Sequence, residues 1–200
     1  MRWPLAFWRW TFAPEVKDFQ ATAGQDPVLA RGAYLVEGLA TVAPAIPRVG
    51  WACRRSPGGE RWRAYLSGSA PLENWIAKSL RGDHRTGLGS WSEADLVSFL
   101  RTGRSERSAV FGGMSDVVVH SMQYMTDADL TAIARYLKSL PPADPADQPH
   151  VYDESVAQAL FHGDDSKTGA ALYVDNCGAC HRTDGKGYAR VFPPWPATRW

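Results

Sequence analysis

The sequence predicts an all-α fold on three kinds of observation. Apolar residues recur at helical spacing in several segments, most clearly at Leu130, Ile133, Leu137 and Leu140. Residues typical of helix N-caps precede these segments, and Gly or Pro follows them. No segment shows the alternation of apolar and polar residues that marks a half-buried strand. The composition, 44% hydrophobic and 22% charged, is that of an ordinary globular protein.

The first predicted helices lie in the N-terminal half of the chain. DPVLARGAYLVEGLA (26–40) has Leu29, Leu35 and Leu39 near helical spacing and begins with Asp26-Pro27, a favourable start because Pro fits the first helical position. APLENWIAKSLRGD (70–83) predicts a short helix that ends at Gly82.

Two further helices carry their own start signals. In SWSEADLVSFLRTG (90–103) we expect Ser92 as N-cap, with Asp95 three residues later as a capping-box partner and Gly103 as the stop. In MTDADLTAIARYLKSLPP (125–142) Thr126 and Asp129 repeat the device, and two prolines end the helix. The next ten residues, PPADPADQPH (141–150), predict an extended linker.

Charge and hydropathy exclude some classes of function. A net charge of +1 gives no reason to expect nucleic acid as a partner. No apolar run reaches the roughly 18 residues that a membrane span requires. The opening MRWPLAFWRWTFAPEV is aromatic and basic and has no small-residue cleavage site, so it does not predict a secretory signal; such a stretch fits a membrane interface or an ordinary linker packed on its neighbour.

The last predicted helix, DSKTGAALYVDNCGACH (165–181), leads into a chemical motif. Cys177, Cys180 and His181 form Cys-x-x-Cys-His, the attachment signature of c-type haem. One turn between the thiols, with the imidazole next to it, lets all three groups reach one face of a macrocycle. We expect His181 to bind iron through a neutral ring nitrogen, while its other N–H donates to a backbone acceptor that fixes the ring.

Two other interpretations of the cysteines remain open at this point. A thioredoxin-like dithiol normally follows a strand and starts a helix, whereas here a helix precedes the motif. A structural zinc site needs four ligands and would have to recruit Cys53, His150 or His162, which show no ligand spacing. Met114, in a Gly-rich loop before a helix, could reach a haem iron, although core filling or an exposed position is the commoner use of such a Met.

Five segments of the sequence resemble the cytochrome c subunit of membrane-bound bacterial dehydrogenases, of the alcohol dehydrogenase and gluconate 2-dehydrogenase type. The segments are RGAYLVEGLA (31–40), YLSGSAPLENWIAKSLRGD (65–83), WSEADLVSFLRTG (91–103), VFGGMSDVVVHSMQYMTDADLTAIARYLKSLPP (110–142) and GAALYVDNCGACHRTDGKGYARVFPP (169–194). That subunit carries three cytochrome c domains in tandem, each with one Cys-x-x-Cys-His.

The resemblance implies a domain organisation. Residues 1–20 correspond to an aromatic linker, and 21–142 to a cytochrome c-like domain that has lost its haem motif. Residues 143–163 form a Pro-rich linker, and 164–200 a truncated second cytochrome c domain with the motif. The family's first domain is absent.

The resemblance also implies a function and a set of site residues. The cofactor is haem c, with Cys177 and Cys180 as covalent anchors and His181 as proximal iron ligand. Met114 matches the family's sixth-ligand position, here for the lost haem. Electrons pass from a dehydrogenase catalytic subunit to quinone or another membrane acceptor at the periplasmic face. The chain has no catalytic site of its own; it is an electron-transfer subunit of an oxidoreductase acting on CH–OH donors, although it lacks a signal peptide.

Two stretches depart from the family pattern, and we hypothesise that frameshifts caused both. TVAPAIPRVG (41–50) stands where the family has a haem motif, and a shifted reading of allowed codons gives His-Cys-Gly-Ala-Cys-His-Thr there. PWPATRW (194–200), shifted likewise, gives a family-like continuation. On this hypothesis Cys53 is an accident of the wrong frame. An alternative function then follows: a non-functional remnant that binds no haem.

Overall fold

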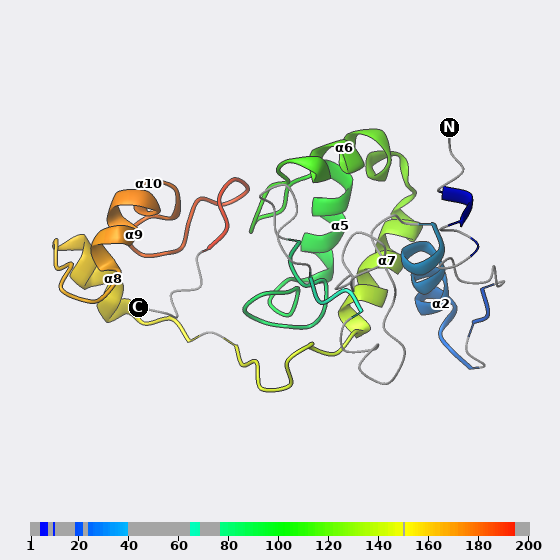
Figure 1. Ribbon diagram of the computed structural model, residues 1–200, viewed down its shortest axis with the longest axis horizontal. Coiled ribbons are helices and arrows are strands. Elements are labelled where there is room, and N and C mark those ends of the chain that lie inside the picture. The colour runs from blue at the N-terminus through cyan, green and yellow to red at the C-terminus, as the bar shows by residue number, and fades with distance from the viewer. Residues whose placement is uncertain are drawn as a thin grey trace.

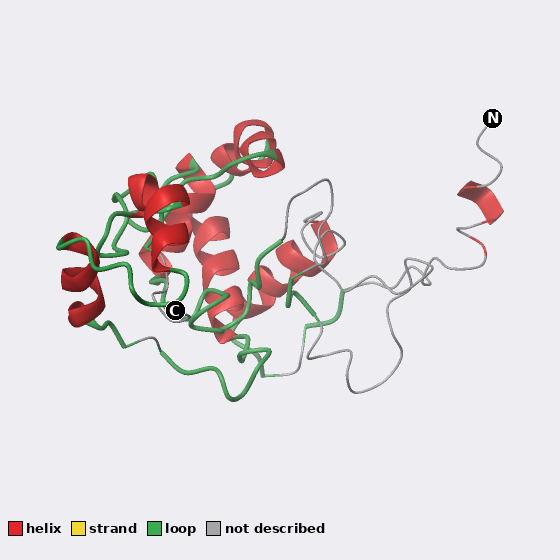
Figure 2. Ribbon diagram, turned by 60° about the vertical axis from the view of Figure 1, so that its left-hand side comes forward, coloured by secondary structure: helices red, strands yellow, loops and turns green. Residues whose placement is uncertain are grey.

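Helices form the whole regular architecture that the computed structural model describes. It describes residues 5–7, 10, 19–21, 24–39, 65–68, 77–149 and 151–194. Within these ranges there is no named strand; only two isolated antiparallel bridges occur, Arg104 with Ala109 and Tyr188 with Phe192. Helices α2, α5, α6 and α7 gather together, whereas α8, α9 and α10 lie apart from them after an extended connection (Figure 1). In Figure 2, coloured by secondary structure, the described residues form helices and loops. The predicted all-α fold is confirmed.

We call the described residues between 24 and 149 the first unit and residues 151–194 the second unit. The first unit opens with α2 (Pro27–Tyr34), which continues as the π-helical turn η1 (Leu35–Leu39). The Asp26 side chain accepts the N–H of Val28 at 2.8 Å, so the predicted start is confirmed.

Helix α2 packs against α7 (Asp127–Ser139) at the centre of the first unit. A Cβ atom at Gly32 would collide with the Ala132 carbonyl and lie 2.7 Å from the Cβ of Tyr136, so the helices meet backbone to backbone there. The predicted apolar stripe of α7 is buried, at 0% exposure for Leu130 and 4% for Ile133. These contacts make α2 and α7 the central pair of the first unit, and α5 also packs on α7.

Helix α5 (Glu93–Thr102) confirms the predicted capping box. The Ser92 hydroxyl accepts the N–H of Asp95 at 3.0 Å, and the Asp95 carboxylate accepts the N–H of Ser92 at 3.1 Å. The helix ends at Gly103, whose φ of 72° is the left-handed conformation that glycine adopts without strain. Helix α6 (Gly113–His120) and the 3₁₀ turn η2 (Met122–Tyr124) then lead to α7.

The predicted helix at 70–83 is wrong for its described part, residues 77–83, which are not helical. Their hydrogen bonds go elsewhere: Leu80 donates its N–H to Leu66, and Arg81 accepts from the N–H of Leu88. The buried Asp83 carboxylate accepts the Ser79 hydroxyl at 2.7 Å and the N–H of Ala143 at 2.9 Å. Ser and Asp side chains that bond nearby polar groups compete with helix formation, which explains the difference.

The second unit consists of α8 (Glu154–Phe161), α9 (Ala170–Asn176) and α10 (Gly178–His181). Helix α8 corrects the expectation that 143–163 is a Pro-rich linker throughout. Asp153 caps it by accepting the N–H of Ser155 at 2.9 Å. Its Leu160 packs with Ala170 and Tyr173 of α9 into a small core, so α8 stays folded by burying its apolar side on the second unit.

No helix in the described part of the chain has the length and apolar character to cross a membrane.

Candidate haem-attachment site

The Cys-x-x-Cys-His motif consists of Cys177, which joins α9 to α10, and of the single helical turn α10. Cys177 ends α9 by donating its N–H to Tyr173 at 2.8 Å. Its carbonyl then accepts the N–H groups of Cys180 at 3.2 Å and His181 at 2.9 Å. Both thiols are free and half-buried. The His181 imidazole is also half-buried. Backbone hydrogen bonds therefore hold the two sulfurs and the imidazole on a single turn.

The His181 ring is oriented by a backbone carbonyl. Its Nδ1 lies 2.9 Å from the carbonyl oxygen of Pro193, twelve residues later. A carbonyl oxygen only accepts hydrogen bonds, so Nδ1 must carry the proton and the lone pair of the neutral ring lies on Nε2. The Phe192 ring meets the imidazole edge to face, with centroids 6.2 Å apart. This tautomer is the one that a metal-binding imidazole needs.

A glycine lets the following loop come close enough to make that contact. Gly187 has a φ of +67° and donates its N–H to the His181 carbonyl at 3.1 Å. A Cβ at this position would collide with the Phe192 carbonyl and lie 2.6 Å from that of Pro193. Any other residue would push the loop away, and the Pro193 carbonyl with it.

Tyr173 fixes the other side of the turn. Its hydroxyl, on α9, donates to the carbonyl of Arg182 at 2.7 Å, directly after the motif. The side chain is buried, and burial raises the pKa of Tyr173 to about 12. Arg182 itself has a φ of 64°, an uncommon value for a residue with a side chain, so the hydroxyl holds a backbone reversal that is costly by itself.

The residues present fit covalent haem. Two free thiols and an imidazole with its lone pair on Nε2 are the donor set that haem c requires. Large apolar side chains are also exposed on α9 and the following loop, at 69% for Leu172, 43% for Val174 and 38% for Val191, and they offer apolar surface beside the motif in the sequence. Among the described residues no group of three or more His, Cys, Asp or Glu could hold a metal ion by itself.

The other predicted site residues lie apart from the motif or outside the described residues. Met114 lies in the first turn of α6, so its placement in a loop before the helix is corrected; its side chain is 38% exposed. His162 follows α8 and is exposed. Cys53, His150 and the stretches of the frameshift hypothesis at 41–50 and 195–200 lie outside the described residues, so that hypothesis stays a prediction.

Sequence reasoning missed two groups that hold the motif in place, Tyr173 and Pro193. It expected a backbone acceptor for His181 without identifying which. The signals were present, since a Gly-rich loop followed by a Pro pair suggests a chain reversal that can return to the motif.

An all-α chain with a Cys-x-x-Cys-His turn and a backbone-oriented histidine is a c-type cytochrome in class. Sequence comparison agrees, because residues 166–198 match the cytochrome c family. The similarity of the chain to curated proteins extends over nearly its whole length.

The relatives are cytochrome subunits of dehydrogenases. The chain is 54% identical over 195 residues to the gluconate 2-dehydrogenase cytochrome c subunit of Pantoea cypripedii, covering 96% of this chain and 44% of that protein. It is 50% identical over 199 residues to the quinone alcohol dehydrogenase cytochrome c subunit of Gluconacetobacter polyoxogenes, covering 97% and 42%. The counterpart from Gluconobacter oxydans (strain 621H) is 45% identical over 196 residues, covering 97% and 41%. The chain thus spans less than half the length of these relatives, and haem c is the cofactor of the family.

Proposed function

We propose that this chain binds one haem c at Cys177 and Cys180, uses His181 Nε2 as an iron ligand, and transfers electrons. The observation that carries the proposal is the hydrogen bond from His181 Nδ1 to the Pro193 carbonyl at 2.9 Å. It selects the tautomer with Nε2 available as a ligand atom and holds the ring in one orientation. When bound, the haem supplies one-electron Fe(III)/Fe(II) chemistry.

The chain's own residues hold and tune this group. Cys177 and Cys180 would hold the haem through thioether bonds to its two vinyl groups, an addition of S–H across a double bond that needs no oxidant. The Pro193 carbonyl keeps the proton on Nδ1 and raises the donor strength of Nε2. Tyr173 holds the backbone at Arg182 through a 2.7 Å hydrogen bond, so the turn that carries both sulfurs stays closed.

We also propose the setting in which this electron transfer takes place. The relatives are named as cytochrome c subunits of gluconate and quinone alcohol dehydrogenases. By analogy, a dehydrogenase catalytic subunit delivers electrons to the chain, and quinone or another membrane acceptor receives them at the periplasmic face. Oxidation of the CH–OH donor belongs to the catalytic subunit. Met114 remains a prediction as a sixth ligand for the haem whose motif is lost.

Covalent attachment is tested by expressing the chain with an added export signal in a bacterium that has haem-ligation machinery. We expect a Soret band, one haem per chain, and haem staining that survives a denaturing gel. The double variant C177A/C180A removes the stained band. The matched control is C53S, which alters the third cysteine and leaves staining unchanged. Staining that persists in C177A/C180A would refute attachment at this motif.

The rival functions give different results in the same preparation. A zinc site gives stoichiometric zinc and no visible absorbance. A redox dithiol gives a reducible Cys177–Cys180 disulfide without haem. A non-functional remnant gives neither metal nor absorbance. Any of these results with the exported wild-type chain would replace the proposed function.

A further inference from the structure

A short turn connects the candidate haem ligand to the first unit. It comprises residues 188–192 and is closed by hydrogen bonds from the N–H of Tyr188 to the Phe192 carbonyl at 3.1 Å and from the N–H of Phe192 to the Tyr188 carbonyl at 2.9 Å. We call it the 188–192 turn. Arg190 lies within it, with a φ of 67°.

The base of the 188–192 turn is attached to His181 on both sides. Gly187, just before the turn, donates its N–H to the His181 carbonyl at 3.1 Å. Pro193, just after it, accepts from His181 Nδ1 at 2.9 Å. A displacement of the turn therefore moves the carbonyl that orients the imidazole.

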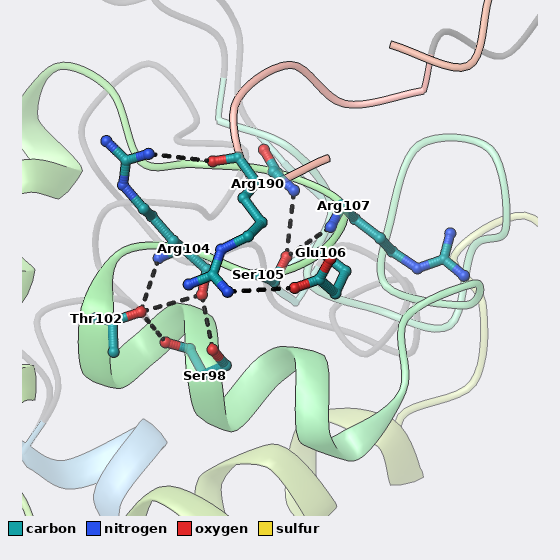
Figure 3. A network of polar contacts seen from close by, with 8 residues as sticks. Ser98, Thr102, Arg104, Ser105, Glu106, Arg107 and Arg190 are labelled. Carbon is teal, nitrogen blue, oxygen red and sulfur yellow. Dashed lines mark hydrogen bonds and ion pairs between the residues drawn. The ribbon is translucent and has the colours of Figure 1, made fainter. Parts of the chain in front are cut away.

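Arg190 contacts the first unit with its backbone and its side chain (Figure 3). Its N–H donates to the carbonyl of Glu106 at 3.3 Å, and its carbonyl lies 3.5 Å from Nη1 of Arg104. Its guanidinium Nη1 lies 3.4 Å from Oε1 of Glu106. The N–H, the carbonyl and the guanidinium of Arg190 thus all contact Arg104 or Glu106 of the first unit.

The receiving loop is held by its own hydrogen bonds, independently of the turn. The Arg104 carbonyl accepts the Ser98 hydroxyl at 2.8 Å, which ties the loop to α5 (Figure 3). Ser105 is buried, and its hydroxyl accepts the N–H groups of Arg107 and Ser108, both at 3.2 Å. This network leaves the Glu106 carbonyl and carboxylate as acceptors for Arg190, so the loop 104–106 is a preformed docking site.

The left-handed backbone of Arg190 supports this interpretation. A non-glycine residue at positive φ carries strain and persists where its surroundings over-determine it. Here the surroundings are the closed turn on one side and the first unit on the other. We propose that the loop 104–106 docks the 188–192 turn, and that Arg190 is a positioning residue that holds the hydrogen bond between Pro193 and His181. The role for His181 rests on the proposed haem function; the docking does not.

The proposed coupling has a direction. A hydrogen bond to the outer nitrogen of a ligating imidazole raises its basicity and stabilises the more highly charged iron. Release of the turn weakens the hold on the Pro193 carbonyl, and we expect the reduction potential to rise. The contact between the two units thereby tunes the second unit's haem.

Docking is tested by residue-resolved amide hydrogen exchange of the wild-type chain in haem-loaded and haem-free forms. The informative amide is that of Arg190, which donates across the two units, whereas that of Phe192 is bonded within the turn. In E106R we expect the residue 190 amide to exchange at least severalfold faster, since a guanidinium at position 106 repels those of both Arg190 and Arg104. The swap E106R/R190E should restore slow exchange.

The matched control is E93R. Glu93 forms a similar exposed ion pair with Arg135 at 3.1 Å, but both residues belong to the first unit. This variant should leave exchange at residue 190 unchanged. Docking is overturned if the wild-type amide exchanges as in an unstructured peptide, if E106R leaves its rate unaltered, or if the swap fails to restore it.

The positioning role is tested by the midpoint potential of the haem-loaded chain. E106R should raise it, while E93R and the charge-conserving swap should stay at the wild-type value. Faster exchange with no change in potential would refute the role of Arg190 toward His181 while leaving the docking intact. If the wild-type chain binds no haem, the proposed function and the positioning role fail together, and exchange in the haem-free form still decides the docking.

Discussion

The first and second units differ most in how they are held together. The main core cluster of the first unit contains eleven buried residues contributed by α2, η1, α5, α7 and the loops between them. The cluster of the second unit contains three, Leu160, Ala170 and Tyr173. In the second unit, side-chain hydrogen bonds from Tyr173 and His181 lie directly around the Cys-x-x-Cys-His motif.

This difference suggests what each unit requires in order to stay folded. Domains of about 40 residues seldom bury enough apolar surface to be stable without a disulfide, a metal or a partner. The second unit, residues 151–194, is close to that size. We therefore expect the first unit to depend on packing, and the second on its few hydrogen bonds, its covalent cofactor and its contact with the first unit.

The largest expected effect on stability is that of shortening a buried side chain in the core of the first unit. Leu130 is fully buried at 0% exposure, so L130A should lower the free energy of unfolding by about 2–5 kcal/mol through lost burial and a residual cavity. The same substitution at Leu172 of the second unit, which is 69% exposed, should change it by less than about 0.5 kcal/mol. Urea denaturation followed by circular dichroism measures both. Equal effects of the two substitutions would contradict the contrast between the units.

The next effect concerns the crossing of α2 and α7. G32A adds a Cβ that meets the Ala132 carbonyl and Tyr136, and we expect a loss of about 1–3 kcal/mol as the helices separate. The control is G113A in the first turn of α6, where a Cβ meets nothing within 4 Å. It should be neutral or more stable by about 0.4–1 kcal/mol, because alanine restricts the unfolded chain. A neutral G32A would mean that α2 is not seated closely on α7.

The sequence could predict the helices whose signals are local. Ser92 with Asp95, and Thr126 with Asp129, determine where α5 and α7 begin because an N-cap needs only a side chain and the next turn. The motif itself was readable for the same reason, since Cys177, Cys180 and His181 are adjacent in the chain.

Features that depend on distant contacts could not be predicted in this way. The segment 77–83 has helical residues, yet Asp83 bonds the backbone at Ala143, sixty residues away, and the helix does not form. The Pro193 carbonyl reaches His181 only because a turn brings it back, which no spacing rule specifies. Helix α8 was a different case: Asp153, Val156 and Leu160 carried a readable signal that the nearby prolines obscured.

The smallest expected effect is that of a substitution in the second unit, which tests whether its hydrogen bonds hold it together. Y173F removes the hydroxyl that donates to the Arg182 carbonyl, and we expect the free energy of unfolding of that unit to fall by about 0.5–1.5 kcal/mol.

The Y173F substitution also alters how the stability of the second unit depends on pH. Because burial raises the pKa of Tyr173 to about 12, above about 10 in an unfolded chain, folding favours the protonated phenol. The stabilisation is complete below pH 10 and falls as the pH rises toward 12. Comparing amide exchange at Gly187 in wild type and Y173F across this range isolates the contribution. If both proteins lose protection in parallel between pH 10 and 12, Tyr173 does not control the turn, and the second unit is held by its other contacts.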